Sequence, residues 1–351
     1  MALLVDIEKI LGDFHLKVAF EAVDKTLALL GASGCGKSLT LRCIAGIEKP
    51  DKGRIVLNGV TLFDSEKGIN LPPQQRRTGL MFQNYALFPN MTVEQNILAG
   101  SKREKDAATR RETVSAVMNS FGLADLAHHY PRQLSGGQQQ RTALARMLVS
   151  DPEILLLDEP FSALDSHLRY QLEQEVQQVI RRLGKTVLLV SHDRHEVYRM
   201  ADSIAVMNRG RVDAVGPKAA VYADPKTQSG AILTGCKNLS RALVLDEGHI
   251  RALDWGITLS VPVGDRAVTA VGIRSHAIAH GVGENRFSCT VTDVLENPFS
   301  LTTQVRLQAA ESGKTIGWEL PTDRWQTIAA ERVEIHLPAD SILLLQDEKE
   351  I

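Results

Sequence analysis

The chain has few cysteines, few aromatic residues and no long apolar run. Aromatic residues make up 5% of the 351 residues, and there are four cysteines, Cys35, Cys43, Cys236 and Cys289. They form no CxxC pair and no regular framework, which excludes a disulfide-stapled scaffold and indicates reduced thiols in a cytosolic protein. No stretch reaches the roughly 18 apolar residues that a membrane-spanning helix needs. The sequence therefore predicts a chain without a transmembrane segment.

An excess of charge of either sign is also missing. The formal net charge is -2, which gives no sign of a nucleic-acid or membrane-surface partner. The first 15 residues carry acids within their apolar stretch and lack a small-residue cleavage site, so we expect no secretory signal. With 44% apolar residues the chain can build a sizeable core, and its length favours two domains.

Up to about residue 223, strand-like and helix-like segments alternate. This alternation predicts an α/β fold with a largely parallel sheet. Residues 3–8 and 15–21 are expected to form strands joined by a turn at 11–13. Continuous apolar runs at 26–30, 154–157 and 186–190 favour buried strands. Helices are expected at 37–47 and 166–183, the second stopped by Gly184, with a helical insert around 101–122.

The pattern of residues along the chain changes after Asp224–Pro225. Short β-favouring runs then alternate with Gly, Asp and Asn turns up to about residue 345, which is typical of a small barrel or sandwich. We therefore assign residues 1–232 to an α/β domain with a helical subdomain at about 88–150. Residues 233–351 are assigned to a second, all-β domain.

The stretch GASGCGKS directly follows the apolar run at 26–30 and precedes the helix expected at 37–47. It matches the phosphate-loop pattern G-x-x-x-x-G-K-[ST] in the strand–loop–helix context that supports it. Backbone N–H groups of such a loop point at phosphate oxygens, the lysine reaches the β- and γ-phosphates, and the serine hydroxyl ligates magnesium. The predicted nucleotide-binding residues are Gly31, Ala32, Ser33, Gly34, Cys35, Gly36, Lys37 and Ser38.

Two acids end the buried strand expected at 154–157. Asp158 is placed to hold Mg²⁺ through water, and Glu159 is the natural general base toward an attacking water. Alone, two acids at a strand end could equally be solvated surface, but a phosphate loop requires a magnesium ligand. His192 follows the strand expected at 186–190. At the carboxyl end of a parallel strand it could bind the γ-phosphate and hold the water, although a lone histidine is often structural.

The segment LSGGQ introduces another helix. Ser135 and Gln138 have capping-box spacing, and the two glycines between them leave bare N–H groups at the helix start. The pattern has two interpretations. It could be only a well-capped helix, or the start of this helix could be a second anion-binding site, distinct from the phosphate loop.

Together GASGCGKS, LSGGQ, ILLLDEP, the SALD of 162–165, Gln83 and His192 resemble the ATP-binding subunits of ABC transporters. The resemblance covers roughly the first two-thirds of the chain. It implies ATP and Mg²⁺ as cofactors, Lys37, Glu159 and His192 as catalytic residues, and Ser38, Asp158 and Gln83 at the metal. It also makes Asp165 the acid that crosses the dimer interface. Phe14 is the candidate for stacking on adenine, with a core role as its alternative.

In this family each ATP lies between the phosphate loop of one subunit and the signature of the other, so one copy of each motif implies a homodimer. Ser135, Gly137 and Gln138 would then meet the partner's ATP. Separate integral membrane permease subunits, a peripheral position on the cytoplasmic face of the inner membrane and an extracytoplasmic solute-binding protein are further implications. A nucleic-acid partner is not expected.

The cargo is less sharply indicated. The segments at 71–77, 83–89 and 272–274 resemble importers of sugars, sulfate, molybdate, iron or polyamines, with a C-terminal regulatory domain of oligonucleotide-fold type. Residues 234–240 and 285–345 resemble most the molybdate-import ATPases, which implies a possible oxyanion on that domain. Sulfate or thiosulfate import is the near alternative. A soluble, non-transport ABC ATPase and an oxyanion-storage module stay open as readings from other classes.

Overall fold

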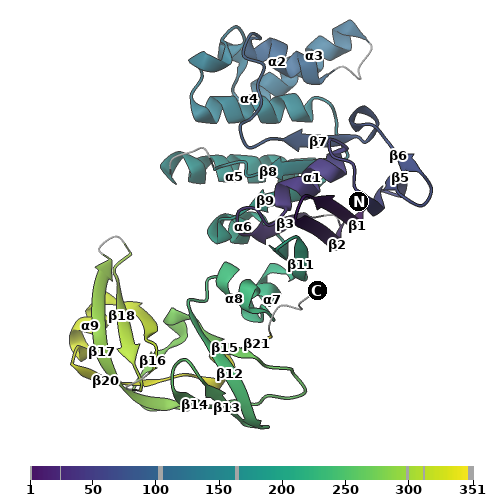
Figure 1. Cartoon of the computed structure of the whole chain (residues 1–351). Coiled ribbons are helices and arrows are strands. Elements are labelled where there is room, and N and C mark those ends of the chain that lie inside the picture. Colours follow the sequence, from purple (N-terminus) through teal and green to yellow (C-terminus); the bar gives the residue numbers. More distant parts are fainter. Residues whose placement is uncertain are drawn as a thin grey trace. The chain divides into compact units, whose positions relative to one another are not determined.

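The computed structural model describes residues 2–23, 25–101, 106–162, 166–297, 300–310 and 313–346. The chain divides into two compact units, residues 1–218 and 219–351 (Figure 1). This division lies earlier in the chain than the boundary expected after residue 232. Most of the short helix α7 (Lys218–Ala223) and all of α8 (Gln228–Leu233) therefore belong to the second unit.

An eleven-stranded sheet organises the first unit. Its strand order is β6-β5-β4-β1-β2-β11-β10-β3-β9-β8-β7. The strands are β1 (Ala2–Leu11), β2 (Phe14–Val23), β3 (Thr26–Gly31), β4 (Lys52–Leu57), β5 (Val60–Asp64), β6 (Ile69–Asn70), β7 (Thr78–Met81), β8 (Ile154–Asp158), β9 (Thr186–Ser191), β10 (Ser203–Asn208) and β11 (Arg211–Pro217).

Only one half of this sheet is parallel. Strands β10, β3, β9, β8 and β7 pair in parallel, whereas β1, β2, β4, β5 and β6 form antiparallel pairs. Short turns such as the one at Gly12, with φ 57°, allow antiparallel pairing between sequence neighbours. The expected parallel sheet is therefore correct for strands β10, β3, β9, β8 and β7 and incomplete for the N-terminal strands.

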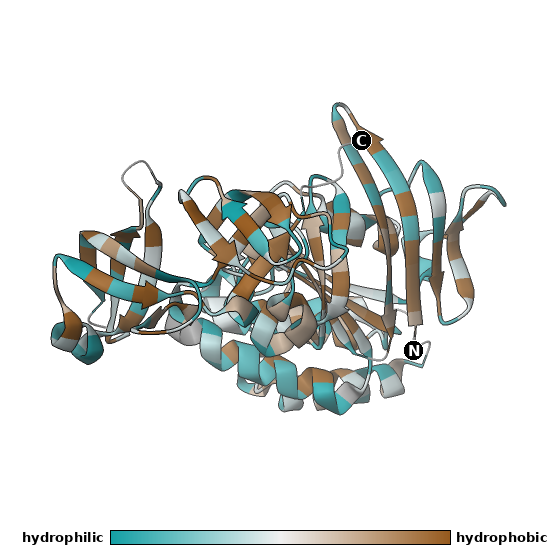
Figure 2. Cartoon of the chain, turned by 90° about the horizontal axis from the view of Figure 1, so that it is seen from below, coloured by the Kyte–Doolittle hydropathy of each residue, from teal (hydrophilic) through white to brown (hydrophobic). Residues whose placement is uncertain are grey.

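Hydrophobicity explains which strands are buried on both faces. Every residue of β3, β8 and β9 is buried, as expected for continuous apolar runs covered on both faces. β2 alternates buried and exposed residues over most of its length, and Figure 2 shows such bands on the strands beside the N-terminus. The phosphate-loop segment thus follows one of the fully buried strands of the sheet.

The helices of the first unit are α1 (Lys37–Ala45), α2 (Val93–Gly100), α3 (Ala107–Ser120), α4 (Gly136–Leu148), α5 (Ser166–Leu183) and α6 (Arg194–Met200). Helices α2, α3 and α4 share a small core of their own, which includes Val93, Ile97 and Met118. The predicted helical insert is thus confirmed. Gly184 follows α5 with φ 58°, as its stop role requires.

The second unit contains two antiparallel five-stranded sheets, β14-β13-β12-β15-β21 and β16-β20-β17-β18-β19. They share a core that includes Trp255, Trp318 and Trp325. The expected β-rich domain is confirmed, while α8 and α9 were not anticipated. The elements are β12 (Asn238–Asp246), β13 (His249–Ala252), β14 (Ile257–Ser260), β15 (Ala270–Ile273), β16 (Ala279–His280), β17 (Arg286–Asn297), β18 (Thr302–Gln308), β19 (Ile316–Pro321), α9 (Thr322–Ile328), β20 (Arg332–His336) and β21 (Ile342–Leu345).

Candidate nucleotide site

The glycine-rich loop runs from the end of β3 to the start of α1. Gly34 and Gly36 have φ values of 80° and 103°, in the left-handed region that side chains disfavour. A Cβ on Gly36 would lie 2.6 Å from Leu16 Cδ1 and 3.1 Å from Phe14 Cζ. The loop therefore needs glycine at this position for both its backbone conformation and its space.

Lys37, the first residue of α1, is only 4% exposed. Its ammonium group donates hydrogen bonds to the carbonyl oxygens of Gly31 and Ala32, both at 2.8 Å. The side chain thus curls back over the loop instead of extending into solvent. A buried cation held at a glycine-rich loop before a helix suits a phosphate chain.

Ser38 and Asp158 meet across α1 and β8. The Ser38 hydroxyl donates to Asp158 Oδ1 at 2.7 Å. Burial raises the pKa of the Asp158 carboxyl above its ordinary value, and the neighbouring charge of Glu159 adds to this. A hydroxyl and a carboxylate beside a phosphate site fit Mg²⁺, which binds through few protein oxygens and completes its shell with water and substrate phosphates.

Glu159, His192 and Gln83 converge from three neighbouring strands. The amide N–H of Glu159 donates to Val190 O at 3.0 Å, which ties the end of β8 to β9. Glu159 itself has φ 44°, and His192 Nδ1 lies 3.1 Å from its Oε1. Gln83 Nε2 donates to Glu159 Oε2 at 3.3 Å and to Ser162 Oγ at the same distance. These contacts form at the carboxyl ends of parallel strands, where open α/β sheets bind ligands.

The signature residues lie on a different element. Ser135 caps α4, and its hydroxyl and the Gln138 side chain form the predicted capping box. Ser135 is exposed and Gly137 is buried. Helix α4 packs against α2, α3 and β7. Among the described residues, no hydrogen bond joins Ser135, Gly137 or Gln138 to the phosphate loop.

Phe14 and Asp165 are the two remaining residues predicted for the site. Phe14 begins β2, is half-buried, packs against the core of the first unit and lies beside Gly36. It therefore stands next to the loop while also contributing to packing. Asp165 lies outside the described residues.

Sequence reasoning missed an arginine that bonds the loop after Gln83. Arg146 of α4 donates to the carbonyl oxygens of Tyr85 and Ala86, just after Gln83. Nothing in the local sequence around Arg146 distinguishes it from an ordinary helix-surface arginine. Tyr85 and Ala86, with φ values of 58° and 45°, are equally inconspicuous as sequence.

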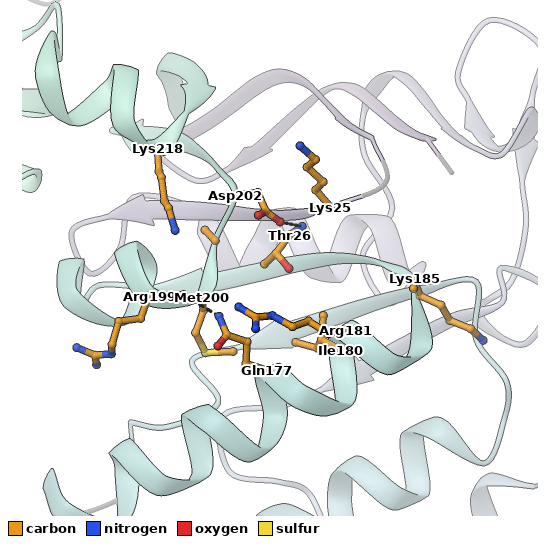
Figure 3. Close-up of a pocket in the computed structure, with 12 residues that line it drawn as sticks. Lys25, Thr26, Gln177, Ile180, Arg181, Lys185, Arg199, Met200, Asp202 and Lys218 are labelled. Atoms are coloured by element: carbon orange, nitrogen blue, oxygen red, sulfur yellow. Dashed lines mark hydrogen bonds between the residues drawn. The ribbon is translucent and has the colours of Figure 1, made fainter.

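A basic pocket of about 260 Å³ lies at the opposite edge of the sheet (Figure 3). It is lined by Thr26 at the start of β3 and Lys185 just before β9, whereas the phosphate loop and His192 follow the far ends of these strands. Several of its cations are already engaged. Arg199 bonds Glu173, and Lys185 donates to Pro152 O. This pocket is separate from the nucleotide site.

A pocket in the second unit gives the oxyanion prediction no support. Its walls are largely apolar, and its charged residues are Arg266, Glu284 and Asp340. Arg266 already pairs with Asp224 at 3.1 Å. Two carboxylates and one neutralised cation do not favour an anion.

The loop, the strand-end acids and the sheet order define a nucleotide-binding protein of the P-loop class. Residues 17–162 match the family described as ABC transporter. The "Spermidine/putrescine import ATP-binding protein PotA" of Nitratidesulfovibrio vulgaris is 38% identical over 270 residues, 74% of this chain and 71% of that relative. The chain belongs to the ATP-binding proteins of ABC transporters.

Other relatives match over the first unit. The protein of the same name from Bacillus cereus is 45% identical over 214 residues, covering 61% of this chain and 64% of the relative. The "Putrescine transport ATP-binding protein PotG" of Escherichia coli is 46% identical over 215 residues, which cover 60% of this chain and 55% of that relative. The chain thus spans less than two thirds of these two relatives. All three names concern polyamine transport, and two of them import, so the molybdate prediction finds no support here.

Solved structures agree with this assignment. The dimeric, post-hydrolysis ATP-binding cassette MJ0796 bound to ADP and Pi has a TM-score of 0.53 at 28% identity, covering 62% of this chain and 98% of that one. The cbiO1 protein of Clostridium perfringens, part of the ABC transporter complex cbiONQ, has a TM-score of 0.56 at 29% identity, with 64% and 91% covered. Within the described part of this chain, no helix is long and apolar enough to span a membrane.

Proposed function

We propose that this chain is the ATP-hydrolysing subunit of an ABC importer. The observation that supports this most is the convergence of Ser38, Asp158, Glu159, His192 and Gln83 beside a complete phosphate loop. A pure nucleotide-binding module has no need of Glu159 at this place. The complete set therefore favours hydrolysis over storage or sensing.

Each residue has a role that its position supports. Lys37 and the loop N–H groups would hold the β- and γ-phosphates. Ser38 and Asp158 would hold Mg²⁺ with Gln83 at the edge of its shell, and the ion would neutralise charge on the phosphate oxygens. Glu159 would accept the proton of the attacking water, and His192 would orient that carboxylate and contact the γ-phosphate.

The active assembly in this proposal is a homodimer. The exposed Ser135 and the bare start of α4 are available to the γ-phosphate of an ATP bound by a second copy, together with Gly137 and Gln138. Asp165 and the adenine-stacking role of Phe14 complete the proposed site. ATP would close the dimer and hydrolysis would release it, and the difference in affinity between the two states can do work on a partner.

The proposed partners are integral membrane permease subunits and, through them, an extracytoplasmic binding protein. The chain would lie peripherally on the cytoplasmic face of the membrane. For cargo, the names of the relatives favour the polyamines spermidine and putrescine. Import of an oxyanion is the second candidate, favoured only by the resemblance of the tail segments at 234–240 and 285–345.

Reconstitution of the chain with its permease and binding protein tests the cargo. In vesicles with the binding protein added outside, spermidine or putrescine should stimulate ATP hydrolysis and enter the lumen, while molybdate and sulfate should do neither. The variant Glu159→Gln in the same vesicles controls for leakage. If molybdate alone stimulated ATP hydrolysis, the cargo would be the oxyanion and not a polyamine. ATP hydrolysis that stays independent of any permease would overturn the transport role.

A further inference from the structure

The segment between Gln83 and α2 has an unusual backbone. Tyr85 and Ala86 both have positive φ, 58° and 45°. Side-chain-bearing residues disfavour this conformation, so other contacts must enforce it. The local hydrogen bonds from Tyr85 N to Phe82 O and from Ala86 N to Asn84 O make a tight turn but do not extend to the rest of the fold.

The contact that enforces this turn comes from α4. Arg146 Nη1 donates to Ala86 O at 2.7 Å, and Nη2 donates to Tyr85 O at 2.8 Å. The same guanidinium lies 5.3 Å from the centre of the Phe88 ring, in cation–π range. One planar guanidinium group thus contacts Tyr85, Ala86 and Phe88. Its fixed fork of N–H donors suits it to bond two carbonyl oxygens at once.

A second side chain holds the far end of the segment. Asn96 of α2 is fully buried and accepts from Phe88 N at 2.8 Å. Its amide donates to the carbonyl oxygens of Phe88, Met91 and Thr92. With Arg146 at the start and Asn96 at the end, the chain from Tyr85 to Thr92 has little freedom to shift.

Gln83 stands two residues before this clamped turn. Its amide reaches Glu159 Oε2 and Ser162 Oγ at 3.3 Å, which is long for a hydrogen bond and sensitive to small displacements. A shift of about 1 Å in a positioned group can cost about 10²-fold in rate. The exact place of the Tyr85–Ala86 turn therefore matters for the site.

We propose that Arg146 is a positioning residue for ATP hydrolysis: by bonding the Tyr85 and Ala86 carbonyls it keeps Gln83 against Glu159. In this proposal Arg146 contacts the loop after Gln83 and acts through Gln83. The inference rests on the proposed roles of Gln83 and Glu159 but is independent of the cargo.

A double-mutant cycle of the full chain tests this role. ATP hydrolysis is measured for the wild type, Arg146→Ala, Gln83→Ala and the double variant. We expect Arg146→Ala to lower kcat roughly ten- to a hundredfold with KM for ATP within about twofold of wild type. The double variant should be no slower than Gln83→Ala alone, within about twofold, because Arg146 then has nothing left to position. The proposal would be overturned if the fall in kcat of the double variant equalled the product of the two single falls. A wild-type kcat for Arg146→Ala would also overturn it.

Two further variants separate positioning from folding. Arg146→Lys keeps the charge and stem but cannot bond both carbonyls in the same fork, so it should fold and still lower kcat, less than Arg146→Ala does. Arg111→Ala, on the exposed face of α3, is the matched control and should behave as wild type. Amide hydrogen exchange at residues 83–88 should quicken in both Arg146 variants and not in the control. Unchanged exchange there would contradict the clamp even if hydrolysis fell. A wild-type chain without ATPase activity would instead refute the proposed function.

Discussion

His192 Nδ1 lies 3.1 Å from Glu159 Oε1, and Gln83 approaches the other carboxylate oxygen of the same residue. The two oxygens of Glu159 are thus held from opposite sides by residues that follow β9 and β7. A carboxylate fixed in this way at a strand end can accept a proton from a water in one defined direction.

We predict that Glu159→Gln lowers kcat for ATP hydrolysis by about 10²–10⁴-fold, the usual contribution of a general base. The amide keeps the size of the side chain and one of its two acceptor atoms, so ATP affinity should change by no more than a few-fold. Steady-state hydrolysis and equilibrium binding of a labelled ATP measure the two effects separately. Glu153→Gln, near the start of β8 and away from the loop, is the control. Hydrolysis at the wild-type rate in Glu159→Gln would remove this residue from the proposed role.

The phosphate loop allows a matched pair of glycine variants. Gly34 and Gly36 both have positive φ, but a Cβ on Gly34 would meet nothing within 4 Å, whereas one on Gly36 would collide with Leu16 and approach Phe14. Gly34→Ala should therefore lose about 1–2 kcal/mol of folding free energy from backbone strain alone. Gly36→Ala should lose about 1–3 kcal/mol more from overpacking.

Urea unfolding of both variants without nucleotide measures this difference, which concerns stability and not ATP binding. Gly184→Ala, which follows α5 with φ 58° and open space around it, serves as a strain-only control outside the loop. Equal losses for Gly34→Ala and Gly36→Ala would show that Leu16 and Phe14 yield to the added methyl group.

Much of this site could be predicted because its signals are local. The loop at 31–38, the acids after β8 and the Ser135–Gln138 capping box each lie within a few consecutive residues whose chemistry fixes their form. The Arg146 clamp could not be predicted, because it joins residues about sixty positions apart in the chain. The strands expected at 3–8 and 15–21 pair antiparallel as β1 and β2, but β4 and β5, which extend this half of the sheet, were not expected. Leu57 of β4 pairs with Leu3 of β1, which lies far away in the chain, so the local sequence does not reveal this partner.

A buried acid, Glu196, lies on the helix that follows His192 in the chain. Glu196 of α6 is 4% exposed, and burial raises the pKa of its carboxyl to about 8. Ser191 bonds the carboxyl and Arg169 lowers its pKa, whereas Glu173 and Asp193 raise it. Within the described residues its Oε1 atom has no hydrogen-bond partner.

The direction of the pH effect follows from these values. Below pH 4.5, the ordinary pKa of a glutamate, both the folded and the unfolded chain carry the proton. As the pH rises the unfolded chain loses it first, so the free energy of unfolding falls until the folded carboxyl titrates near pH 8, and is level above that. The total loss has an upper bound of about 5 kcal/mol. Glu196→Gln removes the titrating group, and its stability should therefore exceed that of the wild type by a margin that grows between pH 5 and pH 8. Urea unfolding across this range, with the exposed Glu112→Gln of α3 as control, measures the margin. A margin that is constant with pH would show that Glu196 keeps an ordinary pKa in the folded protein.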